Sequence, residues 1–148
     1  MSASNSNINS LKDLIKSLKY GSEDKSNTEI LKNIKFGFKE IEHLCFWDRD
    51  NYSKISIDKN GFGELVLICW EKDQQSPIHD HDLDEAWTYI IKGEITEEIY
   101  NSGNNSQLEE TIILEQTGIS SIKSESNKVH RLINSFNGRS VSLHLYKK

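Results

Sequence analysis

The residues best suited to chemistry are histidines, and two of the five stand two positions apart at His79 and His81. In a strand, residues i and i+2 point to the same face, so both imidazoles would face one space and could share one metal ion. A His-x-His pair also occurs in loops that bind no metal, because histidine is frequent on protein surfaces. The spacing alone therefore leaves a metal site and an ordinary loop both open.

A third ligand would have to come from a distant strand, and His130 is the best candidate because it begins the strand-like segment HRLIN. Three neutral imidazoles suit zinc, iron, nickel or copper, and the order of metal affinities does not select iron. The sequence has no Cys-x-x-Cys pair, so a metal site must be built from histidines and carboxylates. We expect His43 to be structural, and Cys45 and Cys69 to be buried free thiols.

The elements that must position these histidines are strands. After Trp47 the sequence changes to short alternating segments, and Asn60-Gly61 is typical of a hairpin turn. Short strands at this spacing favour an all-β sandwich or barrel over residues 46–148. The segments with strand character are 52–57, 64–70, 86–93, 94–100, 110–116, 118–124, 130–136 and 140–146.

The N-terminal part of the chain reads as helical. Residues 1–10 predict a flexible tail. Apolar residues then recur at helical spacing from Leu11 to Leu18 after a candidate cap at Ser10, and again from Ile30 to Leu44 after a candidate cap at Thr28. We therefore expect two helices within residues 11–45.

The length and charge of the chain indicate how many domains it forms and which kinds of partner it could bind. The 148 residues suit a single domain, which we expect to span residues 1–148. The net charge of −5 and the scattered lysines argue against a nucleic-acid partner. No apolar run is long enough to span a membrane, and the polar N-terminus does not read as a secretory signal. We expect a cytoplasmic monomer or small homo-oligomer.

Three segments together carry a resemblance to the cupins, and among these to the thiol dioxygenases, most of all the cysteine dioxygenase type I family. CW followed by SPIHDH resembles the family's first motif, VHRLIN the segment of its third histidine, and SVSLHLY the strand of its Ser-His-Tyr triad. The likeness extends from about Tyr52 to Tyr146. The general cupin pattern is incomplete, because the glycine before the first motif is missing and residues 124–126 replace a common Pro-x-Gly turn. The resemblance implies a cupin jelly-roll β-barrel with the two helices packed outside it.

The resemblance also implies a non-haem iron(II) centre held by His79, His81 and His130, although nickel or zinc could occupy a purified sample. Enzymes of this family add both atoms of O₂ to the sulfur of L-cysteine and form cysteine sulfinic acid. Three neutral ligands leave open metal positions for such chemistry. The implied partners are a small thiol and O₂. Dioxygenation of 3-mercaptopropionate or another thiol acid, and a non-catalytic metal-binding cupin sensor, stay open as alternatives.

Ser142, His144 and Tyr146 alternate along SVSLHLY and so share one strand face, which would also be expected of the polar side of a half-buried strand. By resemblance, Ser142 orients His144, and His144 orients the Tyr146 hydroxyl toward the metal-bound substrate. Animal members crosslink this tyrosine to a cysteine. Ala86 stands at the matching position, as in the bacterial branch. Strand alternation points the neighbouring Glu85 away from the metal, so we expect it not to be a ligand.

The substrate carboxylate is gripped in this family by the arginine of a Tyr-x-Arg motif, and the matching residues here are Tyr52 and Lys54. Lysine keeps the positive charge and loses the fork that binds a carboxylate through two hydrogen bonds. Lys54 also fits an ordinary solvated lysine. Arg131 and Arg139 are alternatives, although strand alternation points Arg131 away from His130.

Overall fold

A computed structural model describes residues 7–19, 27–61, 63–78, 85–101, 107–123 and 127–147. Its described helices are α1 (Leu11–Lys19), α2 (Asn27–Lys32), α3 (Phe38–Ile41) and the 3₁₀ helix η2 (Glu42–Leu44). Its strands are β1 (Ser53–Asn60), β2 (Gly63–Trp70), β3 (Glu85–Lys92), β4 (Ile95–Asn101), β5 (Leu108–Leu114), β6 (Ile119–Lys123), β7 (Lys128–Ile133) and β8 (Ser140–Lys147). None of the helices in these ranges is long and apolar enough to cross a membrane.

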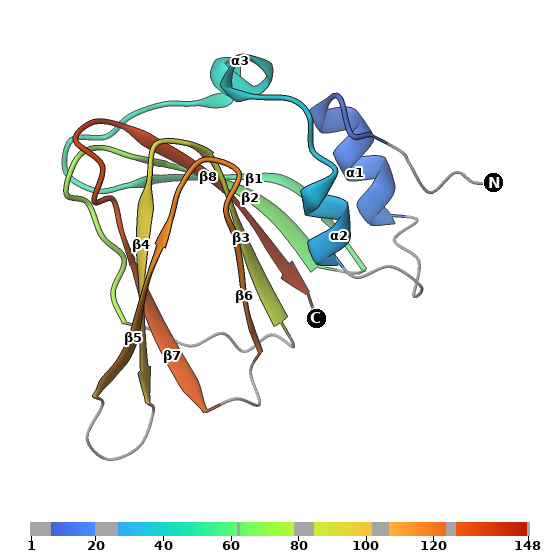
Figure 1. The fold of residues 1–148 in the computed structure, drawn as a ribbon. Coiled ribbons are helices and arrows are strands. Elements are labelled where there is room, and N and C mark those ends of the chain that lie inside the picture. Colours follow the sequence, from blue (N-terminus) through green and yellow to red (C-terminus); the bar gives the residue numbers. More distant parts are fainter. Residues whose placement is uncertain are drawn as a thin grey trace.

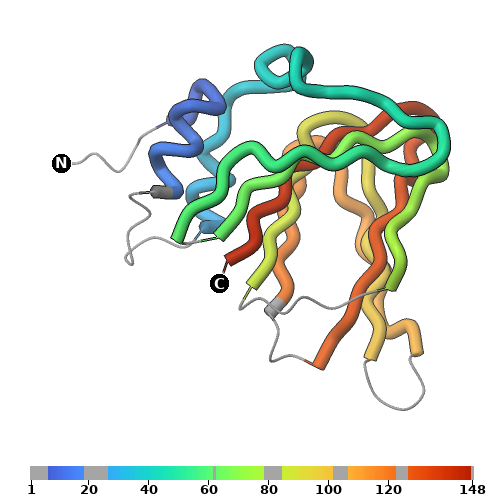
Figure 2. The backbone as a smooth tube through the Cα atoms, turned by 180° about the vertical axis from the view of Figure 1, so that it is seen from behind, coloured from blue at the N-terminus to red at the C-terminus, as the bar shows by residue number. Residues whose placement is uncertain are grey.

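The strands form two antiparallel sheets that face each other (Figure 1). One sheet has the order β1-β2-β8-β3-β6, and the other has the order β5-β4-β7. The sheets meet near the top of the view and spread apart toward the bottom, which Figure 2 shows from behind. The all-β architecture predicted from strand spacing is confirmed. The buried apolar residues between the sheets are Val66, Ile68, Trp70, Ile90, Ile95, Leu114 and Leu132.

The helices α1 and α2 cover the outer face of the five-stranded sheet (Figure 1). Leu14 of α1 and Leu31 of α2 are buried in one cluster with residues of β2, β3 and β8. Each fully buried aliphatic side chain of this kind stabilises the fold by about 1.5–3 kcal/mol. Thr28, predicted as a helix cap, instead lies inside α2, and its hydroxyl accepts a hydrogen bond of 3.0 Å from the indole N–H of Trp87.

The N-terminal tail is shorter than predicted. Ile8 is only 2% exposed and forms a parallel bridge with Ile34, with its backbone N–H donating to the carbonyl of Asn33 over 2.9 Å. The prediction of a flexible tail through residue 10 is therefore wrong from Ile8 onward. The predicted cap of α1 is confirmed, because the Ser10 hydroxyl accepts the backbone N–H of Asp13 at 3.1 Å.

The second predicted helix is also wrong in its extent. In place of one helix over residues 28–44, the chain forms α2, α3 and η2 as separate short pieces. The bridge at Ile34 takes the backbone out of helical hydrogen bonding, and Gly37 precedes α3 in an extended conformation. Glycine is also a poor helix former. His43, expected in that helix, lies in η2 and is exposed.

The hairpin between β1 and β2 turns one residue later than predicted. Asn60 pairs with Gly63 as the last residue of β1, so the turn begins after Asn60 and is not centred on Asn60 and Gly61. Gly63 has a φ of +149°, and a Cβ at this position would clash with the backbone carbonyl of Tyr146 on β8. This glycine is therefore needed inside the strand, where it allows β8 to approach closely.

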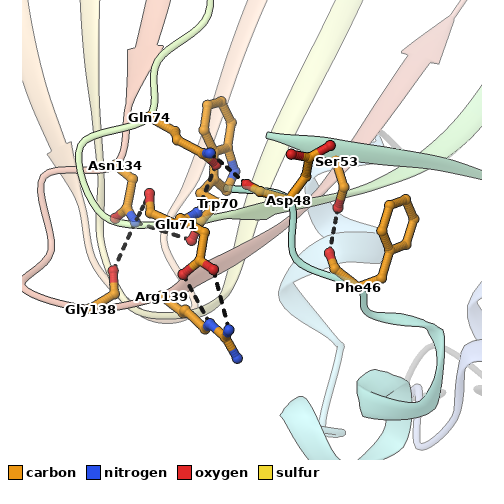
Figure 3. A network of polar contacts seen from close by, with 9 residues as sticks. All are labelled: Phe46, Asp48, Ser53, Trp70, Glu71, Gln74, Asn134, Gly138 and Arg139. Atoms are coloured by element: carbon orange, nitrogen blue, oxygen red, sulfur yellow. Dashed lines mark hydrogen bonds and ion pairs between the residues drawn. The ribbon is translucent and has the colours of Figure 1, made fainter. Parts of the chain in front are cut away.

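Asn134 follows β7 and joins it to two other strand ends (Figure 3). Its side chain is fully buried, and Nδ2 lies 3.2 Å from the carbonyl oxygen of Trp70, 2.9 Å from that of Glu71 and 2.8 Å from that of Gly138. Its Oδ1 accepts the Ser140 hydroxyl at 2.7 Å. The amide therefore holds the end of β2, the end of β7 and the start of β8 together.

The segment after β2 runs along the end of β7. The backbone N–H of Ser76 donates to the carbonyl of Leu132 at 2.9 Å, and the Ser76 hydroxyl accepts the N–H of Leu132 at 3.0 Å. The N–H of Asn134 donates to the carbonyl of Gln74 at 2.8 Å. These bonds fix the chain beside the strand that carries His130. Ser76, at this point of the chain, is three residues before His79 in the sequence.

Replacement of Asn134 by alanine is expected to lower the free energy of unfolding by about 2–4 kcal/mol, because it leaves buried carbonyl oxygens without a donor. Urea denaturation followed by circular dichroism measures the change. Asn101→Ala is the matched control, because Asn101 is exposed at the end of β4, and it should shift the value by about 0.5 kcal/mol or less. Equal effects of the two substitutions would contradict the linking role of Asn134.

Candidate active site

A pocket of about 390 Å³ lies between the two sheets. Its volume suits a small molecule. It brings together residues from five strands and from the segment after β2, among them several that the sequence singled out. The lining residues are Tyr52, Lys54, Glu64, Ile68, Trp70, Ser76, Pro77, Ala86, Thr88, His130, Leu132, His144 and Tyr146.

Tyr52 and Lys54, predicted to bind substrate, both line this pocket. The ring of Tyr52 packs against Trp70 with centroids 4.8 Å apart, which fixes the start of β1 against β2. The Lys54 side chain is exposed, and its ammonium group makes no hydrogen bond or ion pair with any residue in the described ranges. The Lys54 side chain therefore brings a positive charge to the lining of the pocket.

The two arginines considered as alternatives do not line the pocket. The Nε of Arg131 donates to Glu98 at 2.9 Å, on the side of β7 away from His130. Arg139 binds both carboxylate oxygens of Glu71, at 3.0 and 3.2 Å (Figure 3). Both guanidinium groups are thus engaged elsewhere.

Ser142 and His144 lie in a buried chain of hydrogen bonds between β2, β8 and β3. The indole N–H of Trp70 donates to the Ser142 hydroxyl at 2.9 Å, and that hydroxyl lies 2.6 Å from Nε2 of His144. The other ring nitrogen, Nδ1, lies 3.3 Å from the hydroxyl of Thr88. Sequence reasoning missed Thr88, which lies directly opposite His144 in the β3–β8 pairing, because that register is visible only in the folded sheet.

Tyr146 and His144 are in contact through their rings, whose centroids are 6.2 Å apart and whose planes differ by 20°. Tyr146 stands between Glu64 on β2 and Ala86 on β3 in the strand register. Burial raises the pKa of Tyr146 to about 12, and the charges of Tyr52 and Glu64 act in the same direction. The phenol is therefore protonated at neutral pH and can donate a hydrogen bond.

His130, the predicted third metal ligand, is 3% exposed and is joined to a residue that sequence reasoning missed. Its Nδ1 lies 2.8 Å from a carboxylate oxygen of Glu97 on β4, and Glu97 is 1% exposed. The other carboxylate oxygen accepts the hydroxyl of Ser120 on β6. The available signal was alternation in EITEEIY, which places Glu97 on the same face as Ile95 and Ile99.

The predicted ligands His79 and His81 lie outside the described residues. Within the ranges that are described, no group of three or more His, Cys, Asp or Glu side chains could hold a metal ion. His130 nevertheless fits a metal ligand, because Nδ1 faces Glu97 and the ring lines the pocket, so that a metal would bind through Nε2. Glu85 begins β3 and does not line the pocket, whereas its neighbour Ala86 does.

Comparisons with known proteins agree with the motifs. A sequence profile of the cysteine dioxygenase type I family matches residues 2–148. Cysteine dioxygenase type 1 from Danio rerio is 27% identical over 150 residues, which cover 92% of this chain and 73% of that protein. The Bos taurus protein of the same name is 26% identical over 105 residues, which cover 68% of this chain and 52% of its own length. The chain thus spans about half the length of this mammalian relative.

Solved structures support the fold. A cupin superfamily protein from Desulfitobacterium hafniense superposes with a TM-score of 0.56 at 12% identity, covering 71% of this chain and 84% of its own. Identity this low is evidence for the fold alone. The predicted cupin β-barrel is confirmed, and short helices pack on its outside.

The raised pKa predicts that Tyr146 remains protonated at pH 10 in the folded protein, where an ordinary tyrosine is half ionised. Absorbance at 295 nm should therefore differ between the metal-free protein and its Tyr146→Phe variant by only about 1% of one phenolate, given a pKa of about 12. The pKa of Tyr146 is higher in the folded protein than in the unfolded chain. Its contribution to the free energy of unfolding is therefore complete below pH 10 and is lost as the pH rises toward 12. If the Tyr146→Phe variant at pH 10 lacked the absorbance of half a phenolate, the prediction that Tyr146 stays protonated would be wrong.

Proposed function

Since the chain belongs to the cysteine dioxygenase type I family, we propose that it is a non-haem iron enzyme that adds O₂ to the sulfur of L-cysteine. Members of this family are thiol dioxygenases that typically use iron. The observation that supports the proposal best is the pocket between the sheets. It gathers the buried His130, the protonated Tyr146 and Lys54, which pairs with no residue in the described ranges, around a space sized for a small molecule.

The proposed reaction converts a thiol, R–SH, and O₂ into a sulfinic acid, R–SO₂H. Both oxygen atoms become bonded to sulfur, the S–H proton becomes the acidic proton of the product, and O₂ accepts the four electrons that sulfur loses. His79, His81 and His130 would hold the iron, which would supply open coordination positions and redox chemistry for this reaction.

Tyr146 is proposed to donate its phenolic proton in a hydrogen bond to the reacting groups. Its ring is held by stacking on His144, and His144 is held at both nitrogens by Ser142 and Thr88. Ala86, opposite Tyr146, has no sulfur, so we infer that the phenol stays free of a thioether crosslink at this position. The phenol then retains its proton and its donor role across the neutral pH range.

Lys54 is proposed to bind the substrate carboxylate. The ammonium group supplies the charge that a carboxylate requires, with one point contact in place of an arginine fork. This contact would serve L-cysteine and 3-mercaptopropionate alike, since both carry a carboxylate. A thiol acid without an amine is therefore the second candidate substrate.

The proposal predicts that the iron-loaded protein consumes O₂ with L-cysteine and forms one cysteine sulfinic acid for each O₂ consumed. An oxygen electrode and mass spectrometry of the product measure the two quantities. 3-Mercaptopropionate run in parallel decides between the substrates, because a strong preference for it would remove L-cysteine from the proposal. A fully iron-loaded protein that consumes no O₂ with either thiol would instead support a non-catalytic metal-binding cupin.

Replacement of Lys54 by glutamine should raise the KM for the thiol acid by about 10-fold or more while kcat changes little, because a charge-assisted contact to the carboxylate is lost. Steady-state oxygen uptake measures both constants. Lys59→Gln is the matched control, since Lys59 is an exposed lysine of the same strand that does not line the pocket. A KM in Lys54→Gln equal to that of the control would exclude Lys54 from substrate binding.

A further inference from the structure

We propose that Glu97 is a positioning residue for the metal ligand His130. Its carboxylate accepts the Nδ1–H of the imidazole, which fixes the ring and leaves the lone pair of Nε2 for the metal. The proposal rests on the proposed function to the extent that His130 binds a metal.

The geometry holds the carboxylate of Glu97 at both oxygens. One oxygen lies 2.8 Å from Nδ1 of His130 on β7, and the other accepts the hydroxyl of Ser120 on β6. Because β6 belongs to the five-stranded sheet, and β4 and β7 to the three-stranded one, the contacts of Glu97 span the two sheets. A carboxylate fixed from two sides can set the direction of the ring that it holds.

Stability alone does not account for this carboxylate. Glu97 is 1% exposed and shares the interior with Ile95 of its own strand and Leu132, which lies opposite it on β7. Burial of an ionisable pair carries a desolvation penalty, and apolar residues in its place are often neutral or stabilising. A carboxylate behind a ligating histidine, in contrast, fixes the tautomer and makes the ligating nitrogen more basic.

The same two strands carry a second carboxylate contact that provides a matched control. Glu98 lies directly opposite Arg131 on β7 and forms an ion pair with it. This pair is partly exposed and joins β4 to β7 as the pair of Glu97 and His130 does, and both of its members also bond to the Tyr100 hydroxyl. Loss of the Glu98–Arg131 ion pair removes a contact between the two strands and leaves the His130 imidazole in place.

The test compares Glu97→Gln with Glu98→Gln by titration of each metal-free full-length protein with Co(II), a visible-spectrum probe of the site. Glutamine keeps the shape of the side chain and can still accept Nδ1–H, but it lacks the charge. We expect Glu97→Gln to weaken Co(II) binding by about 10- to 100-fold and to shift the ligand-field bands, while Glu98→Gln stays within about 2-fold of wild type. Wild-type affinity and bands in Glu97→Gln would overturn the proposal.

Urea unfolding of the metal-free variants separates positioning from a merely structural role. If Glu97→Gln unfolds more easily but binds Co(II) like wild type, Glu97 is structural and the proposal fails. If Glu97→Gln does not fold, Ser120→Ala provides the test in its place. This variant removes the hydrogen bond to one carboxylate oxygen of Glu97 and leaves the His130 side chain unchanged. We expect it to weaken binding by several-fold, and an unchanged affinity would overturn the proposal.

The outcome also distinguishes this proposal from the function on which it rests. A wild-type protein that oxidises a thiol, together with a Glu97→Gln variant of unchanged metal affinity, would remove only the positioning role. A wild-type protein that does not bind Co(II) or Fe(II) would remove both the metal centre and the role of Glu97.

Discussion

The buried amide of Asn134 is the interaction on which the arrangement of the site depends (Figure 3). An amide offers both donors and an acceptor, so one side chain can satisfy polar groups from several directions. Asn134 uses them to join the end of β2, the end of β7 and the start of β8. These elements carry or lead to the groups with candidate chemistry. His130 lies on β7, His144 and Tyr146 lie on β8, and β2 leads into the segment that precedes His79.

The two faces of the five-stranded sheet have different roles: the outer face contributes to stability, and the inner face carries the candidate site residues. Along β8, Leu143 and Leu145 point outward and pack in the cluster that includes the helices. The alternating residues Ser142, His144 and Tyr146 point inward, where the second sheet encloses them. Because the outer face supplies much apolar burial, the inner face can carry polar side chains without loss of the fold.

The polar groups of the interior occur as connected sets. Glu97 joins His130 to Ser120, and His144 lies between Ser142 and Thr88. Among the described residues, no buried side-chain nitrogen or oxygen is left without a hydrogen-bond partner. Fully satisfied networks in a low-dielectric interior are rigid, which suits groups that must hold a ligand or a ring in one orientation.

The sequence by itself determined the strands, the shared face of Ser142, His144 and Tyr146, and the family, because alternation and motif spacing are local properties of the chain. It did not reveal Glu97 as the partner of His130 or Thr88 as the partner of His144. Those contacts depend on which strands become neighbours and in what register. The tertiary structure also divided the second predicted helix into shorter pieces, because the bridge to Ile34 competes with local helix formation. It placed Lys54, and neither Arg131 nor Arg139, at the pocket. Partner choice across sheets is set by packing at long sequence separation, and no local pattern encodes it.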